Sequence, residues 1–176
     1  MNNLPQLVAK LAAPLLRPGQ AGPVKILVVE DETHQREMWW RLIRQEGVEV
    51  SVASTQSEAL EELGRVDVLI LDWFLGNVTA QVILDQFLSH RPGSPCAVVS
   101  GQMTNQLQSE LYLSGVHNVF RKPAELNALK RTIDRYIEYV RLKRDGSMLR
   151  KRLVAAVALV LLLAATDVVK LVGGVL

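Results

Sequence analysis

The chemically active side chains of this sequence follow short apolar runs. Asp72 comes directly after the aliphatic residues 68–71. Three other apolar runs end in acids, in a hydroxyl and in an ammonium group, at Glu30-Asp31, Ser100 and Lys122. Three carboxylates in one pocket repel one another unless a proton or a hard cation such as Mg²⁺, which prefers oxygen ligands, relieves the repulsion. A lysine and a small hydroxyl beside such an ion favour phosphate binding.

The elements that carry these residues have the pattern of buried strands. Consecutive apolar residues at 68–71 are typical of a strand covered on both faces, as in a parallel sheet. In an open α/β sheet, ligands collect outside the carboxyl ends of the strands. We therefore expect Asp72 and the residues that end the other apolar runs to lie together at one edge of a sheet.

Strand-like and helix-like periods alternate along the chain. Strands are expected near 25–29, 48–52, 68–71, 96–99 and 116–120. Helices are expected at 33–45, 54–63, 78–89, 102–114 and 124–143. Because crossovers between parallel strands are right-handed, this alternation predicts an α/β fold with a doubly wound, five-stranded parallel sheet.

The segment 24–140 resembles the receiver domain of two-component response regulators of the chemotaxis-regulator-like type. The resemblance covers about two thirds of the chain and implies a flavodoxin-like sheet with strand order 2-1-3-4-5. Four separated motifs carry it in the family's order, namely Ile26-Leu-Val-Val-Glu30-Asp31-Glu, Leu69-Ile-Leu-Asp72-Trp, Val98-Val-Ser100-Gly and Arg121-Lys122-Pro123.

The resemblance also implies a function for the sheet edge. In this family the aspartate at the position of Asp72 accepts a phosphoryl group from a histidine kinase or a phosphotransfer protein. Lys122 and the Ser100 hydroxyl would meet the phosphoryl oxygens. The implied Mg²⁺ ligands are Asp31, Asp72, Glu30 through water, and the backbone carbonyl of Phe74. Such a receiver catalyses only its own phosphotransfer and dephosphorylation, so turnover of a separate substrate is not expected.

Two positions depart from the family's pattern. Val119 stands where the family usually has an aromatic residue, three positions before the lysine. Phe120 is aromatic, but successive residues of a strand point to opposite faces, so its ring is expected on the other side. The segment 76–80 reads Gly-Asn-Val-Thr-Ala where the family commonly has Pro-x-x-x-Gly. We therefore expect signalling through Ser100 and the helix after it, without the usual rotation of an aromatic ring.

Two other functions are compatible with parts of this sequence. A receiver-like scaffold that does not depend on phosphorylation could oligomerise or tether a partner through its terminal helices. The grouping of Glu30, Asp31 and Asp72 favours phosphorylation, because packing alone gains nothing from clustered acids. A DNA-binding regulator would need a recognition module after residue 140, where the chain is short and apolar, so no nucleic acid partner is expected.

The cysteine and the histidines of this sequence do not indicate a second functional site, such as a disulfide or a metal site. The single cysteine, Cys96, excludes an internal disulfide and is compatible with a reducing cytoplasm. His34, His90 and His117 lack the spacing of metal ligands and are expected to be solvated or satisfied in the core. Since a Gly-rich nucleotide loop is missing, binding of ATP or NAD is not indicated.

The two ends of the chain differ from its middle in charge. Residues 24–140 carry 11 Lys/Arg and 16 Asp/Glu, residues 1–23 carry 2 and 0, and residues 141–176 carry 7 and 2. Residues 1–23 are predicted to be an amphipathic helix followed by a linker, because Leu4, Leu7, Val8, Leu11 and Leu15 recur at helical spacing.

Residues 141–176 combine a basic run with an apolar one. Six basic residues lie within 141–152, and thirteen consecutive apolar residues follow at 153–165. Asp145-Gly146-Ser147 is expected to end the last receiver helix and to cap a new one. The segment is thus predicted to be a basic linker followed by a hydrophobic helix.

An apolar helix of this kind needs a nonaqueous environment on every side. One interpretation is a cytoplasmic protein anchored to the inner face of the membrane, since the basic run would then stay on the cytoplasmic side. Asp167 and Lys170 oppose insertion unless they pair or lie near the interface. The other interpretation is self-association, in which copies of the helix bury one another. The positive flank makes the membrane our preferred expectation.

Overall fold

The computed structural model describes residues 22–123 and 126–173, with side chains at 22–123 and 127–158. The helix predicted within residues 1–23 lies, except for the last two residues of that range, outside the described residues. Residues Gly22–Arg141 form one compact unit.

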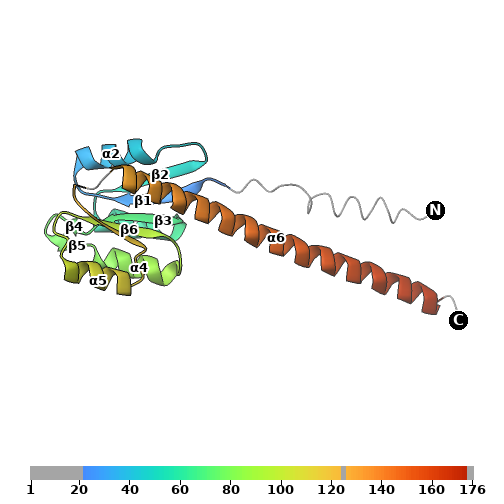
Figure 1. Cartoon of the computed structure of the whole chain (residues 1–176). Helices are drawn as coiled ribbons and strands as arrows, with labels where there is room; N and C mark the ends of the chain where they lie inside the picture. Colours follow the sequence, from blue (N-terminus) through green and yellow to red (C-terminus); the bar gives the residue numbers. More distant parts are fainter. Residues whose placement is uncertain (1–21, 124–125, 174–176) are drawn as a thin grey trace. The chain divides into compact units, whose positions relative to one another are not determined.

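Five parallel strands form the central sheet, in the order β2-β1-β3-β6-β7 (Figure 1). Counted along the chain without the small hairpin described below, this is the predicted order 2-1-3-4-5, and the fold class is confirmed. The strands are β1 (Val24–Val29), β2 (Val48–Ala53), β3 (Val68–Asp72), β6 (Cys96–Ser100) and β7 (Asn118–Arg121).

Helices cover both faces of this sheet (Figure 1). They are α2 (Thr33–Ile43), α3 (Gln56–Glu62), α4 (Gln81–His90), α5 (Asn105–Leu113) and α6 (Leu126–Gly173), with a 3₁₀ turn η1 at Leu63–Arg65. Two helices begin later than predicted because threonines cap them. Thr55 Oγ1 accepts from the N–H of Glu58 at the start of α3, and Thr104 Oγ1 accepts from the N–H of Leu107 at the start of α5.

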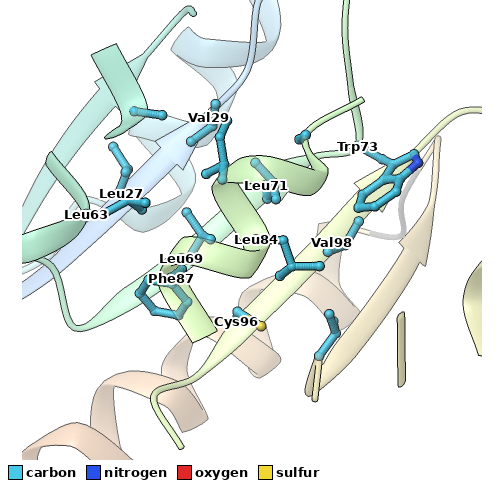
Figure 2. Close-up of a cluster of buried hydrophobic side chains, with 14 of the residues drawn as sticks. Leu27, Val29, Leu63, Leu69, Leu71, Trp73, Leu84, Phe87, Cys96 and Val98 are labelled. Atoms are coloured by element: carbon cyan, nitrogen blue, oxygen red, sulfur yellow. The ribbon is translucent and has the colours of Figure 1, made fainter. Parts of the chain in front are cut away.

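Alternate residues of the central strands enter two separate hydrophobic clusters. Leu69 and Leu71 of β3 face the cluster under α3, α4 and α5, while Val68 and Ile70 face the cluster under α2 and the first part of α6. Figure 2 shows the first cluster, in which Leu84 and Phe87 of α4 lie against the strands and Trp73 lies beside Val98. All five residues of β3 are buried, which explains why the apolar run shows no alternation.

The segment after β3 contains a feature that the sequence did not predict. A two-stranded antiparallel hairpin, β4 (Phe74–Leu75) and β5 (Val78–Thr79), precedes α4. Gly76 lies in the turn with φ of +60°, a value that glycine adopts without strain. The helix predicted from residue 78 therefore begins at Gln81.

The interruption predicted at Asp145-Gly146-Ser147 is wrong. Helix α6 runs without a break over 48 residues, from Leu126 to Gly173. A helical glycine costs only about 1 kcal/mol relative to alanine, and no proline follows to stop the helix. Ser147 Oγ donates to the carbonyl of Arg144 at 2.9 Å, a bond made inside a helix. The basic segment 141–152 is thus helical.

Among the residues that the structure describes, none of the helices combines the length and the apolar content that crossing a bilayer requires.

Candidate functional site

The carboxyl ends of β1, β3, β6 and β7 form one edge of the sheet. Strand register places Val29 beside Leu71, Asp72 beside Val99, and Ser100 beside Arg121. The residues at or directly after these positions are Glu30, Asp31, Asp72, Ser100 and Lys122. The sequence-predicted side chains therefore come from neighbouring strands and share this edge.

Lys122 connects two of the carboxylates. Its Nζ lies 2.6 Å from Oδ2 of Asp72 and 2.9 Å from Oε2 of Glu30. The side chains are mostly buried, at 20% exposure for Lys122, 9% for Asp72 and 1% for Glu30. Burial alone would lower the pKa of Lys122, but the hydrogen bonds to Asp72 and Glu30 outweigh it and raise this pKa above its usual value. The ammonium group is therefore held in its charged form.

Glu30 is the most deeply buried acid of the site. Its Oε2 also accepts from the indole Nε1 of Trp39 at 3.4 Å, and its Oε1 accepts from the N–H of Glu32 at 3.4 Å. Burial raises the pKa of Glu30 above its usual value, and the hydrogen bond from Lys122 offsets part of this effect. Glu30 thus responds to the charge around it more readily than an exposed glutamate would.

Asp31 is exposed and contacts the loop after β3. Its Oδ2 accepts from the backbone N–H of Gly76 at 2.8 Å. The guanidinium of Arg36 donates to the backbone carbonyls of both Glu30 and Asp31 and to Thr33 Oγ1. The turn that carries the two acids is thereby tied to α2 on one side and to the β4–β5 hairpin on the other.

The three carboxylates are close enough to share a cation. One oxygen from each of Glu30, Asp31 and Asp72 lies within 4.8 Å of the others. Among the described residues, this is the one group of possible metal ligands of its kind, and it contains no histidine or cysteine. A set of hard oxygen donors with one exposed member fits Mg²⁺, which keeps several of its waters when bound. The nearby backbone of Phe74 donates its N–H to Asp72 Oδ1 at 3.3 Å.

Ser100 lies at the end of β6 and is fully buried. Its Oγ accepts from the backbone N–H of Gln102 at 3.2 Å, and its carbonyl accepts from the N–H of Lys122 at 2.8 Å. The neighbouring Arg121 donates to the carbonyl of Met103 at 2.7 Å. The loop after β6 is therefore held both by the hydroxyl of Ser100 and by the end of β7.

The two residues of β7 that depart from the family pattern point to opposite faces, as predicted. Val119 packs against the cluster under α3, α4 and α5, whereas Phe120 packs against the cluster under α2 and α6. Both are half-buried. The side where an aromatic ring is usual in this family thus carries the smaller valine side chain.

Cys96 and the three histidines lie outside this group of side chains. Cys96 is a free, buried cysteine at the amino end of β6, the end opposite to Ser100. His117 Nδ1 accepts from the N–H of Cys96 at 3.4 Å, and His90 contacts the carbonyl of Gln86. His34 is exposed in the first turn of α2.

The sequence interpretation missed three residues that shape the site: Arg36, Trp39 and Gly76. Arg36 lies one helical turn after Thr33 in the helix that follows the acids, so its spacing was a usable signal. The indole N–H of Trp39 reaches across to Glu30 at a strand end, and such a contact leaves no local sequence pattern. Gly76 acts through its backbone, which sequence patterns reveal poorly.

Comparisons with known proteins agree on one family. The family model described as "Response regulator receiver domain" matches residues 26–134. An NtrX-like response regulator from Rickettsia bellii is 26% identical over 141 residues, which cover 78% of this chain and 30% of that protein. Another from Rickettsia felis is 27% identical over 139 residues, covering 77% and 29%. The chain thus spans less than a third of the length of these relatives.

Solved structures with the same fold include two receiver domains. The signal receiver domain of a LuxO repressor protein from Vibrio parahaemolyticus gives a TM-score of 0.63 at 18% identity, covering 69% of this chain and 95% of that one. A CheY-like receiver domain protein from Methanospirillum hungatei gives 0.62 at 21% identity, covering 69% and 99%.

Proposed function

Because the chain belongs to the response regulator receiver family, we propose that Asp72 accepts a phosphoryl group from the phosphohistidine of a histidine kinase or of a phosphotransfer protein. The observation that carries this proposal is the position of Lys122. Its ammonium group contacts both Asp72 and Glu30 beside a group of three carboxylates. A cation fixed next to an acid at the edge of a parallel sheet suits the transfer of a group that carries negative oxygens.

The reaction is an in-line displacement at phosphorus. A carboxylate oxygen of Asp72 forms the new O–P bond while the P–N bond to the donor histidine breaks. The electron pair of the broken bond leaves with the imidazole nitrogen, so the products are an aspartyl phosphate and a free histidine. Hydrolysis of the same acyl phosphate by water returns Asp72 to its starting state.

The other residues at this edge of the sheet interact with the negative charge of the phosphoryl oxygens and of the carboxylates. Lys122, already bound to Asp72 Oδ2, pairs with an oxygen of the incoming phosphoryl group. The Ser100 hydroxyl gives up its bond with Gln102 and donates to a second phosphoryl oxygen. Glu30, Asp31, Asp72 and the carbonyl of Phe74 would hold Mg²⁺. When bound, Mg²⁺ supplies the positive charge that reduces repulsion between the carboxylate and the phosphoryl oxygens.

The response that follows is proposed to pass through the Ser100 loop into helix or assembly changes. Val119 offers no ring that could rotate into the space beside Ser100. Location in the cytoplasm, with or without attachment to a membrane, stays a prediction from the sequence.

Phosphorylation is tested by incubating the full chain with acetyl phosphate or phosphoramidate and Mg²⁺ and measuring its intact mass. The wild type is expected to gain one phosphoryl group, which EDTA prevents and Asp72→Asn abolishes. Asp85→Asn is a matched control, because Asp85 is an exposed aspartate of α4 whose side chain bonds only within that helix in the described contacts. Equal labelling of wild type and Asp72→Asn would reject the site. No labelling of the folded wild type would favour the phosphorylation-independent scaffold.

A further inference from the structure

A stripe of exposed leucines continues along α6 beyond the part that packs on the sheet. Leu142, Leu149 and Leu153 are 63%, 69% and 64% exposed. Their spacing of seven and four residues places them at d, d and a of a heptad repeat, with Gly146 at the intervening a position. Apart from Leu142 and Leu149, the residues of 141–152 are charged or polar except Gly146 and Met148, so these two leucines are a defined feature of this segment.

The part of α6 that packs on the sheet uses other heptad positions than the stripe does. In the same heptad frame, the buried apolar residues of the first part of α6 occupy the b, e and f positions. They are Leu129, Ile133, Tyr136, Ile137 and Val140. None of these residues occupies an a or d position, since b and f lie away from an a/d seam and e flanks it. Leu142, Leu149 and Leu153 of the stripe occupy d, d and a and are themselves exposed.

Charges beside the stripe fit a second copy of the same helix. Glu138 and Asp145 occupy g positions, whereas Lys143 and Arg150 occupy e positions, and all four are exposed. In a parallel pair of helices, each g residue faces the e residue five positions later on the other chain. Glu138 would then face Lys143 of the other copy, and Asp145 would face Arg150. An antiparallel pair would bring acids against acids and bases against bases.

We propose that α6 forms a parallel two-stranded coiled coil with α6 of a second copy of this chain, over about residues 138–163. The sequence continues the a/d pattern beyond Leu153 through Ala156, Val160 and Leu163. Because every residue of 153–165 is apolar, the heptad register is set by Leu142, Leu149 and the charged residues at 138–150. The two copies are related by a twofold axis parallel to the helices, so each contributes the same surface. This self-association is a property separate from the proposed phosphorylation of Asp72, and it does not require that phosphorylation.

The first test measures the mass of the full chain in detergent-free buffer by light scattering after size exclusion. A dimer is expected for the wild type and equally for Asp72→Asn. Leu153 and Val154 offer a matched pair, because both are 64% exposed but Leu153 lies in the seam at a and Val154 lies outside it at b. Leu153→Asp is expected to raise the dimer dissociation constant at least about tenfold, and Val154→Asp less than about threefold.

The second test fixes the orientation of the helices. In a parallel pair in register, two copies of Leu149→Cys bring their thiols to within disulfide distance, and mild oxidation is expected to link them. Val154→Cys is expected to stay unlinked, and the native Cys96 does not interfere because it is fully buried. Asp145→Arg alone is expected to weaken the dimer, and adding Arg150→Asp to the same chain should restore it.

Three results would overturn the proposal. The wild type could be a monomer at micromolar concentration, or Leu153→Asp and Val154→Asp could weaken association equally. The full chain could also be recovered only with membranes or detergent, which would assign the same helix to a lipid surface.

Discussion

The ammonium nitrogen of Lys122 lies 2.6 Å from Oδ2 of Asp72. This contact joins the residue that follows β7 to the acid that ends the central strand, β3. The same nitrogen lies 2.9 Å from Glu30. One positive charge therefore faces two buried carboxylates, and Asp31 adds a third negative group nearby. The edge keeps a negative excess that attracts a cation, while Lys122 stays positioned for the oxygens of a phosphoryl group.

Lys122→Met is expected to leave the chain folded but to lower its free energy of unfolding by about 2–4 kcal/mol at neutral pH. The substitution leaves Glu30 and Asp72 buried without their cation, and breaking a buried pair is costly. Because burial already raises the pKa of Glu30, its carboxylate takes up a proton as the pH falls. The deficit is therefore expected to shrink towards acid pH. Urea unfolding of wild type and variant across pH measures both effects.

Lys130→Met is the control for this measurement. Lys130 pairs with Asp134 one turn later on α6, and both side chains are partly exposed. An exposed pair of this kind contributes little, so a change of about 0.5 kcal/mol or less is expected. Equal effects of the two variants would show that the contact between Lys122 and the acids has no special energetic role.

The sheet edge could be predicted from the sequence because its signals are local. The apolar run of β3 ends at Asp72, and burial on both faces removes any alternation from that run, so strand type and strand end can both be read. Partners such as Trp39 and Gly76 were missed because they meet Glu30 and Asp31 only through the tertiary fold. Conversely, Asp145-Gly146-Ser147 gave a local signal for a helix end that the continuous α6 overrides.

Magnesium binding can be followed by the fluorescence of Trp39 and Trp73 in a Trp40→Phe background, because the indole of Trp39 bonds to Glu30 and Trp73 directly follows Asp72 in the sequence. In this background, Asp31→Asn is expected to raise the Mg²⁺ dissociation constant at least about tenfold, since one carboxylate ligand is lost. The bond from Gly76 N–H can persist to the amide oxygen, which limits structural side effects.

Glu32→Gln is the matched control for the magnesium titration. Glu32 directly follows Asp31 in the sequence, but its side chain is exposed and accepts from Gln35. The dissociation constant should therefore change little. If Glu32→Gln weakened binding as much as Asp31→Asn, general negative charge would explain the affinity better than a defined site.

The route from the phosphoryl group to the rest of the domain is predicted to begin at Ser100. When its hydroxyl turns to a phosphoryl oxygen, the N–H of Gln102 loses its acceptor, and amide hydrogen exchange at residues 101–104 should speed up. Ser100→Ala should lose this phosphorylation-dependent change, whereas Val119→Ala should keep it. If Val119→Ala lost the phosphorylation-dependent change in amide exchange and Ser100→Ala kept it, Ser100 would be rejected as the start of the route.

Cys96 predicts a loss of stability at alkaline pH. Burial raises the pKa of its thiol from 9.0 to about 11. The unfolded chain ionises this thiol at lower pH than the folded chain does. The contribution of Cys96 is therefore fully present below pH 9 and is lost as the pH rises towards 11, by roughly 2–3 kcal/mol for a shift of this size.

Cys96→Ala isolates the contribution of the thiol. The variant loses packing atoms and is expected to be less stable than the wild type at pH 8. The gap between the two unfolding free energies should narrow as the pH rises from 9 to 11, because only the wild type carries the thiol. In parallel, a thiol reagent at pH 8 should react with Cys96 only after the chain unfolds, since the side chain is fully buried. A constant gap together with rapid labelling of the native protein would show that the thiol is exposed in solution.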